Sequence, residues 1–91
     1  MDYLRAVAGA LEAAGVPVAD WRAEGDEGWI PFDLSRVSVV SWVHDQAGVG
    51  WSAASGWYLL LIDSPGRRSV VPLRVPVRAT PEEVARAVVP A

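Results

Sequence analysis

The chain has 91 residues, of which 52% are hydrophobic and 21% charged, and its formal net charge is −3. This length supports one domain over residues 1–91, since two smaller units would each approach the size below which a single core cannot sustain a fold. The apolar composition excludes disorder for most of the chain, and the longest apolar run, residues 57–62, is far shorter than the ~20 residues of a membrane-spanning helix.

The first predicted element is a helix over residues 3–14. Leu4, Val7 and Leu11 recur at the spacing of one helix face. Gly15 suits the left-handed residue that commonly follows a helix, and Pro17 prevents the helix from restarting.

Four or five antiparallel strands are predicted in the middle of the chain, where apolar and polar side chains alternate. They cover residues 17–22, 29–34, 36–44, 58–63 and 68–78. The fourth of these is an exception, because it is apolar without alternation. In the last, Pro72 and Pro76 stand at alternate positions, which favours an edge strand.

Two segments predict turns, and the chain closes with a second helix. Residues 45–50 contain two glycines, and residues 64–67 have the composition of a hairpin turn. Thr80 is the predicted N-cap of the last helix, with Pro81 at its first position and Glu83 completing a capping box.

The order of helix, strands and helix predicts an α+β fold. We expect a two-layer sandwich in which an antiparallel sheet of four to five strands carries the N- and C-terminal helices on one face. The helices are expected on the valine-rich side of the sheet, which includes Val37, Val39, Val43 and Val71.

The other face of this sheet is left without a cover from the helices. The apolar strand before the hairpin turn presents large side chains there in either register, one set being Trp57, Leu59 and Leu61 and the other Tyr58, Leu60 and Ile62. Val40, Trp42, Val70 and Pro72 are expected beside them. A soluble monomer rarely leaves such a face in water, and apolar strands are normally covered on both faces. Three covers remain open: a second copy across a two-fold axis, residues 21–34 folded over the sheet, or a different partner or ligand.

Charge is unevenly distributed along the chain. Five acids and one arginine lie within residues 20–33, whereas residues 67–78 hold four arginines and no acid. We expect a row of arginines to orient the partner. The predicted interaction residues are therefore Trp42, Val40, Trp57, Tyr58 and Leu60, with Arg36, Arg68, Arg74 and Arg78.

No catalytic or metal-binding arrangement is predicted. His44 and Asp45 are adjacent, but Ser41 lies on the opposite strand face, and no nucleophile-elbow motif is present. One histidine with scattered carboxylates lacks the spacing of a metal site. Gly48 and Gly50 lack the further glycines and the helix of a phosphate-binding loop. We therefore expect no enzyme activity and no cofactor.

Single-stranded nucleic acid is the alternative partner, because a sheet with Trp42 and several arginines can stack bases and contact phosphates. The net negative charge and the absence of lysine argue against it. A small ligand between helices and sheet is a further alternative, which would need an interior cavity lined by tryptophan. The preferred hypothesis is a non-catalytic protein-interaction domain that forms a homodimer through the far sheet face.

The chain is expected in the cytoplasm, without membrane contact. It contains no cysteine, and an acid stands at position 2, where a signal peptide would carry basic residues. The N-terminal helix and the motif Gly-Val-Pro-Val-Ala-Asp-Trp at residues 15–21 resemble the opening of small actinobacterial domains of unknown function, and residues 81–88 are similar to their C-terminal helix. This resemblance implies an actinobacterial source and a cytoplasmic location, and it implies no functional residue.

Overall fold

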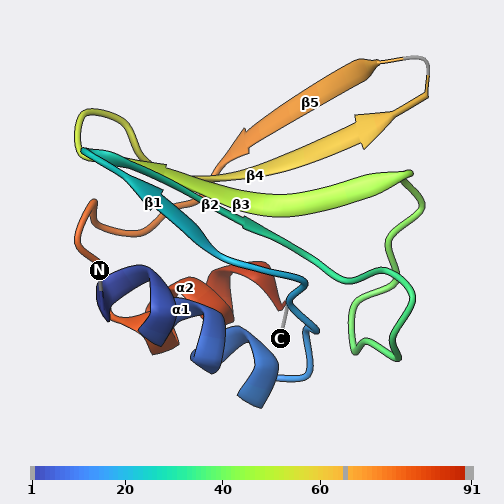
Figure 1. Ribbon diagram of the computed structural model, residues 1–91, viewed down its shortest axis with the longest axis horizontal. Helices are drawn as coiled ribbons and strands as arrows, with labels where there is room; N and C mark the ends of the chain where they lie inside the picture. The colour runs from blue at the N-terminus through green and yellow to red at the C-terminus, as the bar shows by residue number, and fades with distance from the viewer. Residues whose placement is uncertain (1, 65, 90–91) are drawn as a thin grey trace.

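The computed structural model describes residues 2–64 and 66–89. Its elements, in chain order, are α1 (Asp2–Ala13), β1 (Arg22–Glu24), β2 (Glu27–Pro31), β3 (Gln46–Ser52), β4 (Gly56–Asp63), β5 (Arg67–Pro72) and α2 (Pro81–Val88). The strands form one antiparallel sheet of order β1-β2-β3-β4-β5, and both helices lie beneath one of its faces (Figure 1). The predicted α+β architecture is confirmed.

Helix α1 packs and ends as its sequence predicts. Leu4, Val7 and Leu11 are fully buried on one helix face. Gly15 has a φ of 95°, a conformation that favours glycine, and the N–H of Val16 donates to the Leu11 carbonyl at 2.9 Å. The predicted glycine cap is therefore confirmed.

Helix α2 begins with the predicted capping box. The Thr80 hydroxyl accepts a hydrogen bond from the Glu83 N–H at 3.2 Å, and the Glu83 carboxylate accepts one from the Thr80 N–H at 2.9 Å. Pro81 occupies the first turn, where its missing N–H costs no hydrogen bond. Val84 and Val88 are buried on the side that packs into the core.

The sheet face toward the helices, called the inner face below, carries two buried tryptophans of β3 and β4. Trp51 Nε1 donates to the Val77 carbonyl at 2.7 Å, and Trp57 Nε1 donates to the Tyr3 hydroxyl at 3.0 Å. That hydroxyl in turn donates to the Ala79 carbonyl at 2.6 Å. Since buried indole and phenol groups need hydrogen-bond partners, these contacts fasten α1 and the segment before α2 to the sheet.

Residues 36–44, predicted as a strand, instead form part of the loop between β2 and β3. The Val39 N–H donates to the Gly15 carbonyl at 2.9 Å, while Val37 and Val43 are 98% and 88% exposed. The alternation of valines reflects a local strand preference, but the segment is held by a contact with the end of α1 and pairs with no strand. The prediction that these valines form a sheet face under the helices is therefore wrong.

The turn predicted at residues 45–50 is wrong as well, because this segment enters β3, the central strand. Gly48 and Gly50 point away from the helices, and aromatic rings occupy the space that side chains would fill there. A Cβ on Gly48 would lie 2.6 Å from the ring of Trp29, and one on Gly50 would meet the ring of Tyr58. Glycine is needed at these two positions because the aromatic rings of neighbouring strands pack directly against the backbone of β3. The sequence rules that associate glycine with turns do not take such packing into account.

Two further strand predictions are confirmed in part. The segment at residues 17–22 contains an isolated bridge between Val18 and Phe32, and β1 begins only where that segment ends. The strand predicted at residues 68–78 occupies the edge of the sheet, as expected, but ends at Pro72.

The strand predicted at residues 58–63 and the hairpin turn after it are confirmed. β4 contains this whole segment and pairs with both β3 and β5. In the turn, the Gly66 N–H donates to the Asp63 carbonyl at 2.7 Å. Pro65 of this turn lies outside the described residues.

Candidate interaction surface on the outer sheet face

The sheet face that points away from the helices, called the outer face below, carries a continuous apolar surface. The strand register places these side chains in adjacent rows across β2 to β5. They are Trp29, Pro31, Tyr58, Leu60, Ile62, Val70 and Pro72. Val70 is 58% exposed, and no described helix or loop crosses this face, which is the upper side of the sheet in Figure 1.

Aromatic rings from the neighbouring strands cover the middle of the outer face. The rings of Trp29 and Tyr58 lie against the glycines of β3, so the central strand is covered although it lacks side chains there. A hollow of about 310 Å³ lies at the β1–β2 end, lined by Arg22, Glu24, Glu27, Gly28, Trp29 and Tyr58. The hollow therefore combines two aromatic side chains with a charged rim.

Opposite charges occupy diagonally opposite corners of the outer face. Glu24 and Glu27 are direct partners at the β1–β2 corner, where Arg22 contacts Asp20, with Nε 3.5 Å from the carboxylate oxygen Oδ2. Arg68 lies on β5 at the other corner and is exposed. One corner is therefore acidic and the other basic.

The structure brings together three of the nine predicted interaction residues, which are Tyr58, Leu60 and Arg68. Trp57 faces the other way, because successive side chains of β4 alternate between the two faces. It is only 2% exposed and packs in the core beneath the sheet. Its placement is that of a core residue.

Val40 and Trp42 do not lie on the outer face either. They belong to the loop between β2 and β3 and pack against the core. The ring centroids of Trp42 and Phe32 are 5.3 Å apart, and Phe32 is buried. Residues 21–34 form β1 and β2 within the sheet, so the alternative in which they fold over it is wrong.

The four predicted arginines do not form a row. Arg36 donates two hydrogen bonds to Glu12 in the loop after β2, and the Arg78 guanidinium carbon lies 5.1 Å from the ring centroid of Trp51, a core residue. Arg74 is exposed beyond the end of β5. Only one of the four therefore lies within the strands of the outer face.

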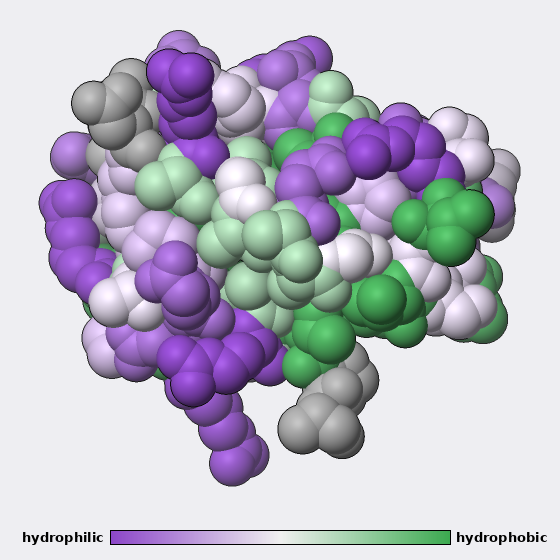
Figure 2. Space-filling model, turned by 90° about the horizontal axis from the view of Figure 1, so that it is seen from below, coloured by the Kyte–Doolittle hydropathy of each residue, from purple (hydrophilic) through white to green (hydrophobic). Residues whose placement is uncertain are grey.

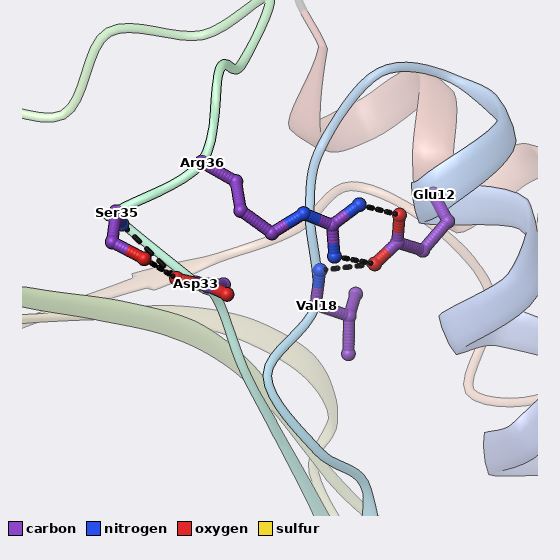
Figure 3. A network of polar contacts seen from close by, with 5 residues as sticks. All are labelled: Glu12, Val18, Asp33, Ser35 and Arg36. Atoms are coloured by element: carbon purple, nitrogen blue, oxygen red, sulfur yellow. Dashed lines mark hydrogen bonds and ion pairs between the residues drawn. The ribbon is translucent and has the colours of Figure 1, made fainter.

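The ion pair of Arg36 belongs to a network that joins α1 to this loop (Figure 3). Glu12 accepts two hydrogen bonds from Arg36, each 2.9 Å, and one of 2.7 Å from the Val18 N–H. These bonds, above all those from Arg36, lower the pKa of Glu12. Asp33 accepts from the hydroxyl and N–H of Ser35 at 2.6 and 3.0 Å, and the Ser35 side chain lowers the pKa of Asp33 most.

We expect this network to make stability fall in acid. Because the folded pKa of Glu12 is lowered from its usual value of 4.5, its contribution is present above that value and is lost as the pH falls through the folded value. Glu12→Gln should therefore lose less stability than the wild type between about pH 7 and about pH 3, measured by urea unfolding. Equal losses in both proteins would contradict a stabilising role for this carboxylate.

A second group of ionisable residues holds the C-terminal end of the loop between β2 and β3. His44 Nδ1 lies 2.9 Å from Asp63 Oδ2, and this hydrogen bond lowers the pKa of Asp63. Asp45 accepts a hydrogen bond from the Ser64 N–H at 2.6 Å. Ser41 is exposed on the loop and has no described hydrogen bond to His44. The group fastens the loop to the end of β4.

Within residues 2–64 and 66–89, no three or more His, Asp or Glu side chains gather as a metal site would require. None of the helices described there combines the length and apolar character needed to cross a membrane.

A second apolar area lies on the helix side of the molecule. A groove of about 510 Å³ between α1 and α2 is lined by Ala10, Ala13, Ala14, Glu82, Ala85, Arg86 and Val89. Figure 2 shows this side, with pale and dark green apolar surface in the middle of the view and further dark green patches toward the loop between β2 and β3. Val37 and Val43 of that loop are its most exposed valines. The described residues therefore carry apolar area on the helix side as well as on the outer face.

Ile62, Val70 and Pro72 lie on the outer face, where the sequence placed them beside or among the apolar side chains of β4. Trp29 and the acidic corner were not predicted there. One signal for Trp29 was present in the sequence. Gly48 and Gly50 stand two residues apart, so they share one face of a strand and leave it bare. Large rings on the neighbouring strands are the natural filling for such a gap.

Comparison with known proteins places the chain in a family. No curated protein and no solved structure matches it significantly. A family model does match, over residues 3–89, which is nearly the whole chain. The resemblance to a small domain of unknown function is thereby confirmed: the chain belongs to the family of unknown function DUF6292.

Proposed function

We propose that this chain is a non-catalytic, cytoplasmic interaction domain that forms a homodimer through its outer face. The observation that supports the proposal is the apolar surface around Trp29, Leu60 and Val70, over which no described segment lies. Covering apolar surface is favourable by roughly 25 cal/mol per Å². A surface of this kind is typical of protein interfaces.

A second copy of the chain is the favoured partner. Two identical faces related by a two-fold axis each present the same residues, so a patch that carries both signs of charge can complement itself. The outer face meets this condition, with Glu24 and Glu27 at one corner and Arg68 at the other.

Single-stranded nucleic acid is the second candidate. Trp29 and Tyr58 are both partners of Gly50 and lie in one row of the sheet, an arrangement on which bases can stack. Glu24 and Glu27 line the hollow beside these rings and would repel phosphates. For this reason the homodimer is preferred.

Leu60→Asp tests the proposal, because it places a charge in the middle of the outer face. In a homodimer the charge would be buried twice, without a partner, so we expect the variant to sediment as a monomer of 9.8 kDa while the wild type has twice that mass. Both proteins are measured at about 100 μM, a concentration that populates even dimers with micromolar Kd. Circular dichroism checks that the variant is folded.

Val37→Asp is the matched control, since it adds the same charge to an exposed valine of the loop between β2 and β3. We expect its mass to equal that of the wild type. A dimer that survives Leu60→Asp and dissociates with Val37→Asp would move the interface to the loop between β2 and β3. A wild type that stays monomeric, and binds single-stranded DNA in a manner that Leu60→Asp abolishes, would replace the proposal with the nucleic-acid function.

A further inference from the structure

We infer that the homodimer forms about one particular two-fold axis, which crosses the outer face at right angles to the diagonal between its charged corners. This inference rests on the proposed function, because it specifies how two copies meet at the same surface. The contact that identifies the axis is Arg68 against the partner's Glu27.

The two corners lie at opposite ends of the sheet in both directions. Across the strands, Glu27 is on β2, next to one edge, whereas Arg68 is on β5 at the other edge. Along the strands, Glu27 pairs with Ser52 at the last residue of β3. Arg68 pairs with Ile62, whose own partner is Gln46, the first residue of β3. The line between the charges is therefore a diagonal of the face.

The charges next to each corner have partners of their own. Near the basic corner, Asp45 accepts a hydrogen bond from the Ser64 N–H at 2.6 Å, and Asp63 Oδ2 lies 2.9 Å from His44 Nδ1. Arg22, the basic residue at the acidic corner, contacts Asp20 and leaves the two glutamates as the excess charge. Arg67, next to Arg68 in sequence, is the direct strand partner of Asp63 and points to the inner face. Arg68 therefore provides the positive charge on the outer side of β5.

When two faces stack about a two-fold axis in their common plane, the two limiting directions of that axis run along this diagonal and across it. An axis along the diagonal places Arg68 against the partner's Arg68 and Glu27 against the partner's Glu27. An axis across the diagonal exchanges the corners, so that each Arg68 meets the partner's Glu27, twice in the dimer. Like charges are unfavourable at an interface and opposite charges fix its register. The charges therefore select the second axis, while the apolar rows supply the contact area.

Cysteine cross-linking reports the axis directly, because the chain contains no cysteine. Arg68→Cys and Glu27→Cys are prepared separately, mixed and treated with a bismaleimide that spans about 10 Å, the usual distance between two sheets packed face to face. We expect a cross-link between the two variants in the mixture and none in either variant alone, since two copies of the same corner would lie at opposite ends of the diagonal. Rapid cross-linking of Arg68→Cys with itself, without a mixed product, would establish the other axis and overturn the inference.

Charge reversal gives an independent measurement. Arg68→Glu should raise the dimer Kd about tenfold, because an attraction becomes a repulsion at two symmetric sites. Adding Glu27→Arg to the same chain should bring the Kd back to within about threefold of the wild type. Arg5→Glu makes the same charge change on an exposed position of α1 and should leave the Kd unchanged.

The outcomes separate this inference from the proposed function. A wild type that is monomeric under all conditions contradicts both. A dimer that Leu60→Asp dissociates, but that is indifferent to reversal at Arg68 and Glu27, keeps the interface and overturns the axis. Weakening by Arg68→Glu without recovery in the double variant also overturns the axis.

Discussion

Trp57→Ala should lower the free energy of unfolding by about 3–5 kcal/mol, the usual cost of removing a large buried aromatic side chain. Trp57 is 2% exposed, and its ring lies 5.9 Å from that of Tyr3 between centroids. The substitution also removes the donor to the Tyr3 hydroxyl, which links the sheet to α1 and to the Ala79 carbonyl. Urea unfolding followed by circular dichroism measures the loss.

Trp57→Phe is the control for the hydrogen bond. It keeps an apolar ring and removes the indole N–H, so a smaller loss of about 1–2 kcal/mol is expected. If Trp57→Ala instead changed the solution mass while leaving stability intact, Trp57 would belong to an interface, and its placement in the core would be wrong.

Gly48→Ala should destabilise the protein by about 1–3 kcal/mol, as is usual when atoms are added to a filled space. The new Cβ would lie 2.6 Å from the Ile30 carbonyl oxygen and 2.6 Å from the Trp29 ring. The carbonyl belongs to the backbone of β2, which is paired with β3 at this residue and cannot move aside cheaply. The shift in the urea midpoint gives the size of the effect.

Gly9→Ala is the matched control for this change. Nothing lies within 4 Å of a Cβ built on Gly9, which is exposed in the middle of α1. Alanine is favoured over glycine in a helix by roughly 0.8–1.0 kcal/mol, so this variant should be more stable than the wild type. If both glycine variants gained stability, β3 would have room on its outer side, and the Trp29 ring would not fill the space beside Gly48.

The helices were predictable because their signals are local. Leu4, Val7 and Leu11 follow the helical period, and the residues around Thr80 form a capping box whose members are three positions apart. The hairpin of β4 and β5 was predictable for the same reason, since its turn lies between two apolar runs.

In residues 36–50 the predicted strand is a loop and the predicted turn is a strand, because contacts with residues distant in sequence determine the conformation of this segment. Alternating valines suggested a strand where the chain forms a loop, held by Glu12 and by the Gly15 carbonyl. Two glycines suggested a turn where the chain forms the central strand, and the rings that fill their places come from Trp29 and Tyr58. Rules based on residues that are close in sequence cannot identify these contacts.

The candidate site was predictable as a surface but not residue by residue. A strand that is apolar on both faces indicated an uncovered side of the sheet, and Tyr58 and Leu60 lie there. Which neighbours join them depends on strand order and register. Val70 was expected beside Leu60 and lies there. Once residues 36–44 were taken for a strand, Val40 and Trp42 were also placed beside Leu60, on the side that the structure gives to Gly48.

The two edge strands, β1 and β5, disfavour the addition of strands from other molecules to the sheet. The run Tyr-Leu-Leu-Leu-Ile in β4 has the composition of fibril-forming segments, but it is enclosed between β3 and β5. The free edge of β5 carries Arg67, Arg68 and Pro72, and β1 at the other edge has only three residues. Charge, proline and short length are devices that stop further strands from being added. The protein can therefore present an apolar face to one partner without providing a template for polymer growth.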